Sequence, residues 1–171
     1  VTATVVKRSM QRAPVFMFRT AREARGFGEW LVENFAGAKA AAESTTRVGK
    51  LFEIEQYPVG NLLYLRFNYT TGDAAGQNMT GKATFAACEW IRATHPLHPK
   101  YMLSGGIDTD KKHSAINTLR TRGRRVVAEA VIKNEVFERI MRVDTKTLFR
   151  ARQVSNAGAL LAGNAYNGPH A

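Results

Sequence analysis

The strongest constraint on the fold is a pair of alternating apolar runs separated by a short turn. The runs VGKLFEIEQY (48–57) and LLYLRFNYT (62–70) flank the turn sequence PVGN (58–61). Proline and glycine between two such runs are typical of a β-hairpin, so we expect two paired strands here. The apolar residues that predict the two strands are Leu51, Phe52, Ile54, Leu63, Leu65 and Phe67.

A strand and a helix are predicted before this hairpin. The short apolar run APVFMF (13–18) is typical of a buried strand. The segment from Thr20, which suits an N-cap, to about Ala42 is rich in Ala, Glu, Leu and Arg. Its spacing predicts an amphipathic helix. The apolar residues that recur at helical spacing are Phe27, Trp30, Leu31 and Phe35.

A second helix and a final strand are predicted after the hairpin. The helix runs from about Asp73 to Ala93 and stops before Pro96, and KYMLSG (100–105) is the strand. The order strand, helix, strand, strand, helix, strand is that of a ferredoxin-like (βαββαβ) α+β fold. Such a fold places both helices on one face of an antiparallel sheet.

A domain boundary is predicted near the glycine pair at 105–106. The first predicted domain covers residues 1–106, and this range includes the strand that leads into it. About 65 residues, 107–171, with a single predicted strand cannot bury a core alone, so we expect part of a second domain. Its predicted elements are a strand at 124–132, a helix at 134–141 and a helix with Asp144 as N-cap.

The net charge of +11 indicates either a polyanionic partner or a basic surface that has no function. Nucleic acid and phosphate-rich cofactors such as NADPH or coenzyme A are the candidate partners. Cys88 is the single cysteine, which excludes a disulfide framework and fits a reducing, cytoplasmic setting. No apolar run approaches the roughly 18 residues that a membrane span needs. The chain begins at Val1 rather than Met, as expected for a piece of a longer protein.

Two segments have the composition of phosphate-binding loops. In TTGDAAGQNM (70–79), glycines allow close approach of a ligand, the helix N-terminus favours a phosphate, and Asp73 can accept from a ribose hydroxyl. In ESTTRVGK (43–50), Arg47 and Lys50 beside two threonines can hold a phosphate. Each segment also has a purely structural explanation, as a glycine-rich helix start and as a helix end with dipole-compensating cations.

Several ordered motifs resemble the 3-hydroxy-3-methylglutaryl-coenzyme A (HMG-CoA) reductase family. They are TGDAAGQNM (71–79), SGGIDTDKKHSAIN (104–117) and GRRVVAEAVI (123–132), preceded by RAPVFMF and ESTTR in the family's order. TDKK followed by AIN is close to a signature of the family. Gly106 stands where the family usually has asparagine, and His113 where it usually has proline.

The resemblance implies a role for particular residues. Lys111 matches the catalytic lysine, whose ammonium stabilises negative charge on the thioester or aldehyde oxygen. The positions that match substrate-binding residues are Arg12, Ser104, Asp110 and Lys112. Those that match cofactor-binding residues are Thr46, Arg47, Val48, Asp73, Ala74, Ala75, Gly76, Gln77 and Asn78. Those that match coenzyme A contacts are Ile140, Met141 and Arg142.

The function that the resemblance implies is metal-free, NADPH-dependent reduction of HMG-CoA to mevalonate and CoA, in isoprenoid biosynthesis. It also implies a small NADP-binding domain followed by an incomplete large substrate-binding domain. The family's active site lies between subunits of a homo-oligomer. The family's catalytic glutamate precedes this region, and its aspartate and histidine follow it, so we expect the isolated chain to be inactive.

A small basic RNA-binding module of ferredoxin-like fold is the alternative. Such domains carry stacking aromatic residues in a defined strand pattern, [KR]-G-[FY]-[GA]-F-V-x-[FY]. The strand NLLYLRFNY lacks this pattern, so the sequence favours the reductase.

Overall fold

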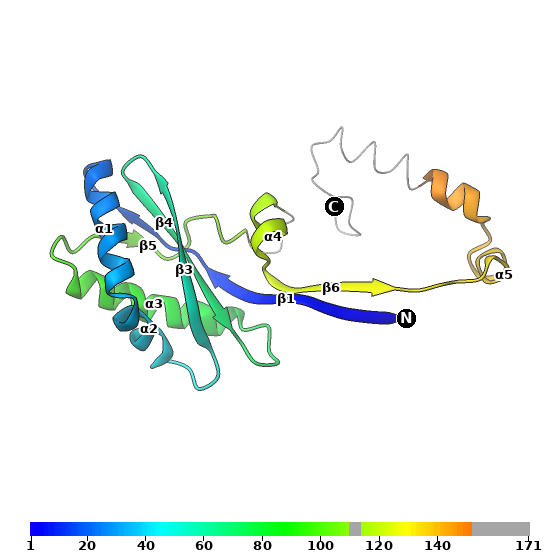
Figure 1. Ribbon diagram of the computed structural model, residues 1–171, viewed down its shortest axis with the longest axis horizontal. Helices are drawn as coiled ribbons and strands as arrows, with labels where there is room; N and C mark the ends of the chain where they lie inside the picture. The colour runs from blue at the N-terminus through cyan, green and yellow to red at the C-terminus, as the bar shows by residue number, and fades with distance from the viewer. Residues whose placement is uncertain (110–113, 152–171) are drawn as a thin grey trace.

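The computed structural model describes residues 1–109 and 114–151 of the chain. It shows a mixed α/β architecture with one six-stranded sheet (Figure 1). The strands are β1 (Thr2–Arg12), β2 (Val15–Met17), β3 (Lys50–Val59), β4 (Leu62–Thr70), β5 (Lys100–Met102) and β6 (Gly123–Glu129). The helices are α1 (Ala21–Glu33), α2 (Phe35–Glu43), α3 (Gln77–Thr94), α4 (Ala115–Arg120), α5 (Asn134–Val136) and the π-helix η1 (Phe137–Met141), and residues 145–151 are also helical.

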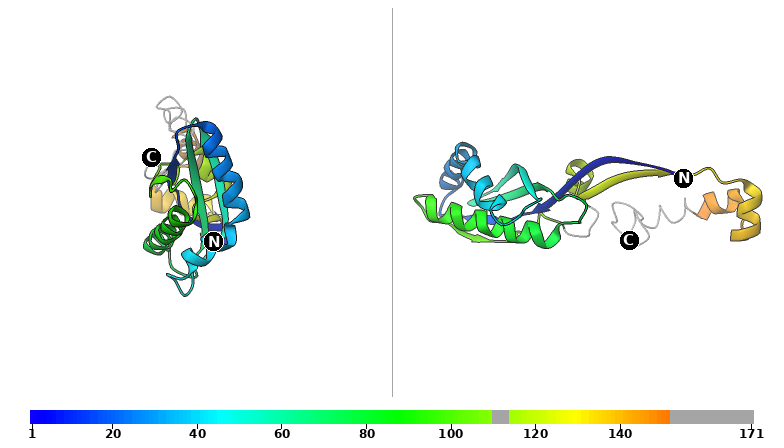
Figure 2. Two further views of the ribbon diagram at one scale, coloured as in Figure 1. Left: turned by 90° about the vertical axis from the view of Figure 1, so that its left-hand side faces the viewer. Right: turned by 90° about the horizontal axis from the view of Figure 1, so that it is seen from below.

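All of the strand pairs are antiparallel, which confirms the predicted kind of sheet. The order is β5-β2-β4-β1-β6, with β3 paired along the other edge of β4. Only the last residues of β1, Met10–Arg12, pair with β4. The rest of β1 pairs with β6 in a two-stranded ribbon (the β1–β6 ribbon), which Figures 1 and 2 show projecting from the helix-covered end of the sheet.

The predicted hairpin is confirmed, and its imperfect alternation has a physical cause. Gly60 adopts a left-handed backbone (φ +58°) in the turn between β3 and β4, a conformation that favours glycine. The pairing of β3 with β4 shifts register between Leu51 and Glu53. This irregularity lets Leu51 and Ile54 both face the core while Phe52 remains 48% exposed.

Strand β4 separates an apolar face from a polar face. Its side chains alternate, and Leu63, Leu65 and Phe67 enter one core with residues of α1, α2 and α3. The helices contribute Ala24, Phe27, Leu31, Ala38, Ala42, Ala83, Ala87, Cys88 and Ile91. The intervening residues Arg66 and Asn68 are also buried, on the opposite face.

The first predicted helix is in fact two helices. Its start is confirmed, because Thr20 and Glu23 form a reciprocal capping box. Asn34 interrupts it between α1 and α2, where the side-chain amide donates to the carbonyl oxygen of Trp30 at 2.9 Å. An asparagine side chain that hydrogen-bonds backbone in this way competes with the helical ladder.

The second predicted helix starts later than the sequence suggested. Gly72 (φ +62°) and Gly76 (φ +81°) are both left-handed, so α3 cannot begin at Asp73 and instead begins at Gln77. Near the C-terminal end of the described chain, Asp144 is confirmed as an N-cap. Its carboxylate accepts from the backbone N–H of Thr147 at 2.9 Å.

The packing of α1 on the sheet can be tested at two adjacent residues. Leu31 is 1% exposed within the core, whereas Val32 is 69% exposed. We expect Leu31→Ala to lower the free energy of unfolding by about 2–5 kcal/mol, through lost burial and a residual cavity. Val32→Ala should change it by less than about 0.5 kcal/mol. Urea unfolding followed by circular dichroism measures both, and equal losses would contradict the packing described here.

Candidate functional site

The two segments predicted to bind a cofactor lie against each other. A Cβ atom added to Gly72 would lie 2.7 Å from Cγ1 of Val48. One added to Gly49 would lie 2.5 Å from Sδ of Met79. Since real Cβ atoms essentially never come this close, glycine at these two positions leaves room for the side chains of Val48 and Met79. The structure thus brings residues 48–49 next to Gly72 and Met79, which flank the predicted cofactor loop 73–78.

The loop before α3 leaves backbone groups open to a ligand. The Thr71 hydroxyl donates to the carbonyl oxygen of Ala74 at 2.7 Å, and a Cβ on Gly76 would collide with Cγ2 of Thr71 at 2.3 Å. Asp73, Ala74 and Ala75 are exposed in this turn. Gly76 is the N-cap of α3 and forms no side-chain cap, and the N-terminus of a helix carries a positive dipole that favours an anion.

Arg47 lies exposed at the rim of this loop. Glu43, a potential partner one helical turn earlier, instead binds Lys50 at 3.1 Å and accepts from the backbone N–H of Leu51 at 3.0 Å. Within residues 1–109 and 114–151, Arg47 forms no ion pair. The Thr46 hydroxyl accepts from the N–H of Gly49 at 3.0 Å and so shapes the turn. The residues present therefore fit a phosphorylated cofactor, with Arg47 as the available cation.

Two of the predicted substrate-binding residues converge on a buried carboxylate. Arg12 Nη1 lies 3.4 Å from Oδ2 of Asp108, and the Ser104 hydroxyl donates to the same oxygen at 3.0 Å. Asp108 is 5% exposed. Arg12 also lies alongside α3, since a Cβ on Gly81 would be 3.6 Å from its Nη2. Arg12 thus lies between the segment that carries Ser104 and Asp108 and helix α3.

The remaining catalytic-loop predictions, Asp110, Lys111 and Lys112, lie outside the described residues. The loop before them contains Gly106 (φ +96°), in the left-handed region that favours glycine and tolerates asparagine best among other residues. That preference accounts for glycine at a position that, by the resemblance described above, matches an asparagine of the family.

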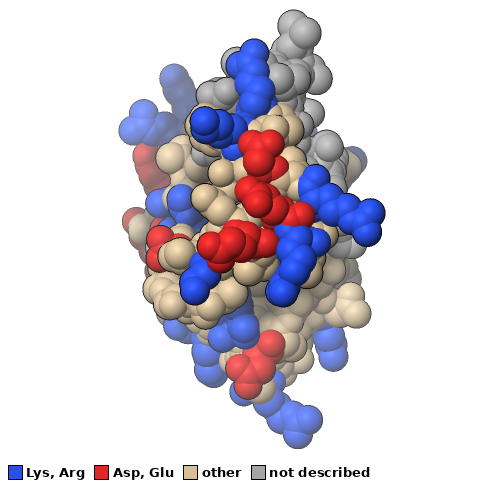
Figure 3. Space-filling view, turned by 90° about the vertical axis from the view of Figure 1, so that its right-hand side faces the viewer, with Lys and Arg blue, Asp and Glu red and all other residues tan. Residues whose placement is uncertain are grey.

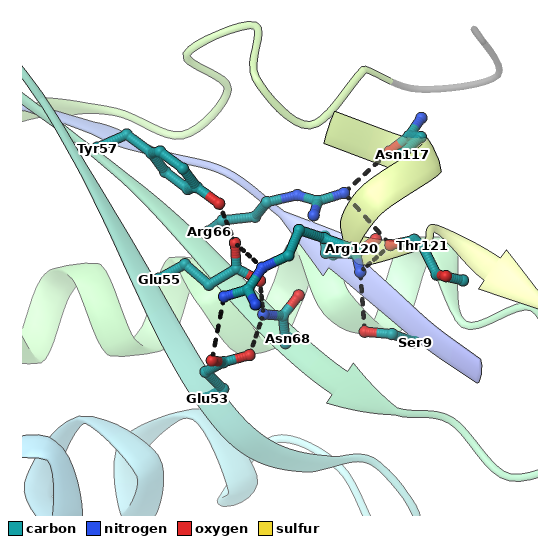
Figure 4. Close-up of polar contacts among 10 residues, drawn as sticks. Ser9, Glu53, Glu55, Tyr57, Arg66, Asn68, Asn117, Arg120 and Thr121 are labelled. Atoms are coloured by element: carbon teal, nitrogen blue, oxygen red, sulfur yellow. Dashed lines mark hydrogen bonds and ion pairs between the residues drawn. The ribbon is translucent and has the colours of Figure 1, made fainter. Parts of the chain in front are cut away.

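Asn117 connects the two described flanks of this loop to the sheet. Its Nδ2 donates to the carbonyl oxygen of Thr109 at 3.1 Å, and its Oδ1 accepts from Arg66 Nη2 at 2.9 Å (Figure 4). Ser114 caps α4 by accepting from the N–H of Asn117. Arg66 projects from β4, the central strand, so its hydrogen bond to Asn117 holds α4 in a fixed position relative to the sheet.

A second polar group on the same face surrounds Glu55. Arg120 Nε lies 3.2 Å from Oε2 of Glu55, Asn68 Nδ2 donates to Oε1 at 2.6 Å, and the Tyr57 hydroxyl also donates to this carboxylate (Figure 4). Burial, the largest single influence, raises the pKa of Glu55, but the hydrogen bonds from these three residues together outweigh it. The pKa of Glu55 is therefore lowered from its ordinary value.

These buried charges were not among the predicted site residues, although the sequence carried a signal for them. Glu55 pairs directly with Arg66 in the hairpin register, and Glu53 with Asn68. Facing residues of opposite charge on the non-core positions of two predicted strands indicate a structured polar face. Burial lowers the pKa of Arg66, while the nearby Glu55 carboxylate raises it.

The predicted coenzyme A contacts are not brought close to the other site residues in this chain. Ile140 and Met141 are 66% and 57% exposed in η1, and Arg142 follows them, beyond the far end of the β1–β6 ribbon (Figure 1). From that end, Figure 3 shows acidic side chains gathered between basic ones. The basic charge is therefore not continuous on this face.

Comparison with known proteins gives one consistent result. The sequence profile of hydroxymethylglutaryl-coenzyme A reductase matches residues 1–171. The chain belongs to this reductase family. The 3-hydroxy-3-methylglutaryl-coenzyme A reductase of Haloferax volcanii is 45% identical over 80% of the chain and 34% of the relative. Those of Aeropyrum pernix and Agrotis ipsilon are 35% and 38% identical, over 98% and 96% of the chain and 39% and 20% of the relatives.

Membership of the reductase family confirms the resemblance seen in the motifs, and these comparisons give no support to an RNA-binding module. The chain spans about a third of the length of the two archaeal relatives. In the described part of the chain, no helix combines the length and the apolar character needed to cross a membrane.

The Glu55 network predicts a pH-dependent stability. Because the folded pKa lies below the unfolded one, the stabilisation is fully present above the unfolded pKa, near 4.5, and is lost as pH falls through the folded pKa. At pH 7 we expect Glu55→Gln to lower the free energy of unfolding by about 1–3 kcal/mol. By pH 3 the difference from wild type should shrink.

Urea unfolding at both pH values measures this difference. The control is Glu29→Gln, which removes an exposed carboxylate bound to Arg25 and should cost less than about 0.5 kcal/mol at either pH. A Glu55→Gln deficit that is as large at pH 3 as at pH 7 would show that the Glu55 charge does not stabilise the fold.

Proposed function

We propose that this chain is part of an NADPH-dependent HMG-CoA reductase, which converts HMG-CoA to mevalonate and CoA through two hydride transfers. The observation that carries the proposal is the family match over residues 1–171. The proximity of residues 48–49 to Gly72 and Met79, which flank the 73–78 loop, supports it, because a dinucleotide site needs both segments. When bound, the cofactor supplies the hydride, and this chain binds and orients the reactants.

The proposed cofactor site uses the loop before α3 together with the turn before β3. The positive dipole at the start of α3 and the compact turn at Gly76 favour a phosphate or ribose close to the backbone. Arg47 binds the 2′-phosphate that distinguishes NADPH from NADH. A guanidinium that forms no ion pair with the described residues suits this task, since its planar fork matches phosphate oxygens.

The proposed substrate site uses Arg12, Ser104, Asp110 and Lys112, with Lys111 as the catalytic lysine. The shared contact of Arg12 and Ser104 with Asp108 supports a common location for these two residues. The Lys111 ammonium stabilises the negative charge that develops on the thioester or aldehyde oxygen. Coenzyme A contacts Ile140, Met141 and Arg142.

We also propose the domain division and the assembly. Residues 1–106 form a ferredoxin-like domain, which the strand order β5-β2-β4-β3 and the single core shared by α1, α2 and α3 support. Residues 107–171 belong to the catalytic loop and the large domain. The active site forms between subunits of a homo-oligomer, so Ile140–Arg142 need not meet the cofactor loop of their own chain.

The role of Lys111 is tested by substitution in the intact enzyme. Lys111→Ala should reduce kcat about 100- to 1000-fold or more, the usual effect of removing one group that stabilises an oxyanion. NADPH binding, measured by fluorescence titration, should stay near the wild-type value. Lys100→Ala, an exposed lysine in β5, is the control and should turn over normally. Turnover of Lys111→Ala near the wild-type rate excludes Lys111 as the catalytic lysine.

The choice of NADPH is tested at Arg47. Losing a hydrogen bond to a charged group costs about 1.5–3 kcal/mol, so Arg47→Ala should weaken NADPH binding about 10- to 150-fold. NADH lacks the 2′-phosphate, and its affinity should hardly change. Arg25→Ala, which removes an exposed arginine of α1, should affect neither cofactor. If Arg47→Ala weakens both cofactors equally, Arg47 does not bind the 2′-phosphate.

A further inference from the structure

Asp108 is a buried carboxylate that has no role among the predicted site residues. Within the described part of the chain, the two buried acidic side chains are Asp108, which is 5% exposed, and Glu55, which is 7% exposed. Glu55 belongs to the hydrogen-bonded network on the sheet. The polar contacts of Asp108 are instead with Arg12 and Ser104, two proposed substrate-binding residues. A buried charge is costly unless it is paired, so a carboxylate at this place calls for an explanation.

The loop 104–108 is fixed to the sheet at the end of β1. The N–H of Gly105 donates to the carbonyl oxygen of Ala13, the residue directly after β1, at 2.7 Å. Gly106, with a left-handed backbone (φ +96°), then turns the chain back. The Asp108 carboxylate thereby reaches the hydroxyl of the residue that opens the loop. The backbone thus sets this contact before any ligand binds.

The contact with Asp108 decides which hydrogen bond Ser104 can offer to a ligand. A carboxylate accepts hydrogen bonds and does not donate them, whereas a serine hydroxyl has one hydrogen and two lone pairs. Ser104 donates that hydrogen to Oδ2 of Asp108 at 3.0 Å, and Ser104 is exposed. Ser104 therefore presents only an acceptor to a ligand.

Arg12 presents the opposite polarity at the same carboxylate. A guanidinium carries several N–H donors and no acceptor. Arg12 directs Nη1 to Asp108 at 3.4 Å, and its side chain is 23% exposed, so donors remain for a ligand. A ligand that contacts both residues needs an acceptor for Arg12 and a hydroxyl for Ser104.

We propose that Asp108 is a positioning residue of the substrate site, which fixes the Ser104 hydroxyl as a hydrogen-bond acceptor. The 3-hydroxy-3-methylglutaryl group carries a hydroxyl and a carboxylate, the two groups that Ser104 and Arg12 need. Ser104 accepts from the 3-hydroxyl, and Arg12 donates to an oxygen of the same ligand. That the ligand is the hydroxymethylglutaryl group rests on the proposed function, whereas the polarity of Ser104 follows from its contact with Asp108.

The test compares two ligands that differ in the 3-hydroxyl group alone. Calorimetric titration of the intact enzyme, without reduced cofactor, gives the dissociation constants of HMG-CoA and of 3-methylglutaryl-CoA, which lacks this hydroxyl. The ratio of the two constants measures the preference for the hydroxyl. Ser104→Ala should lower this preference about 2- to 13-fold, the usual effect of losing one neutral hydrogen bond. It should do so by weakening HMG-CoA and not the analogue.

Asp108→Ala tests the positioning role itself. Without Asp108 the Ser104 hydroxyl can also donate to a ligand, so the preference should fall as it does in Ser104→Ala. The double variant should match Ser104→Ala, because Asp108 acts through Ser104. Loss of the Arg12 contact affects both ligands equally and cancels in the ratio. If Asp108→Ala does not unfold cooperatively, Asp108→Asn, which keeps the volume of the side chain, takes its place.

Glu55→Ala is the matched control. It removes the other buried carboxylate, which contacts neither Arg12 nor Ser104 in the described chain, and should keep the wild-type preference. An equal fall of the preference in Glu55→Ala would assign the effect of Asp108 to general loss of structure and overturn the proposal.

The remaining outcomes separate this inference from the proposed function. Equal weakening of both ligands by Ser104→Ala, or an unchanged preference in Asp108→Ala, overturns the inference. Tighter binding of both ligands by Asp108→Ala also overturns it, since Asp108 would then compete with the ligand for Arg12. If the wild type binds neither ligand, the proposed function fails and the assignment of the hydroxyl fails with it. Turnover of HMG-CoA with a preference that depends on neither Ser104 nor Asp108 leaves the proposed function intact and refutes the inference alone.

Discussion

The buried guanidinium of Arg66 is the contact through which the sheet holds the rest of the site. Arg66 is fully buried, and two of its nitrogens, Nε and Nη1, have no partner within the described chain. Each buried donor without a partner costs about 1–3 kcal/mol, so the bonds that Nη2 does make cannot be given up cheaply. Those bonds run to Asn117 and to the carbonyl oxygen of Thr121, at the two ends of α4.

The hydrogen bonds that the buried Arg66 guanidinium needs also explain the unfavourable backbone conformation of Thr121. This β-branched residue has φ +70°, a conformation that L-residues of its kind rarely adopt. Its carbonyl oxygen accepts from Gln11 Nε2 at 2.8 Å as well as from Arg66, so two buried donors from neighbouring strands fix it. Strain of this sort persists only where surrounding contacts over-determine it. The result is a sharp exit from α4 into β6, which starts the ribbon.

The sequence predicted what depends on neighbouring residues and missed what depends on distant ones. The hairpin and the N-caps at Thr20 and Asp144 each need only a few consecutive residues, and all three are confirmed. The break at Asn34 was missed because one side-chain amide outweighed a continuous helical pattern. The ribbon and the Arg66 contacts join residues far apart in the chain, and no local spacing encodes them. For the candidate site, the family motifs identified the residues, and the structure showed which of them lie close together.

The excess positive charge of the chain is best understood by asking which arginines find an acceptor inside the protein. Arg66 and Arg120 do, in carbonyl, amide and carboxylate oxygens on the polar face of the sheet, and they hold α4 in place. Among the described residues Arg47 forms no ion pair, Arg8 Nη2 has no hydrogen-bond partner, and Arg124 Nη2 reaches the carbonyl oxygen of Asp73 at 3.4 Å. Arg8 and Arg124 line a cavity beside the loop before α3. Cations that the fold does not neutralise, placed beside an uncapped helix, create a local potential for phosphate. Charge that looks uniform in composition therefore divides into a part that holds the fold together and a part that has no ion pair among the described residues.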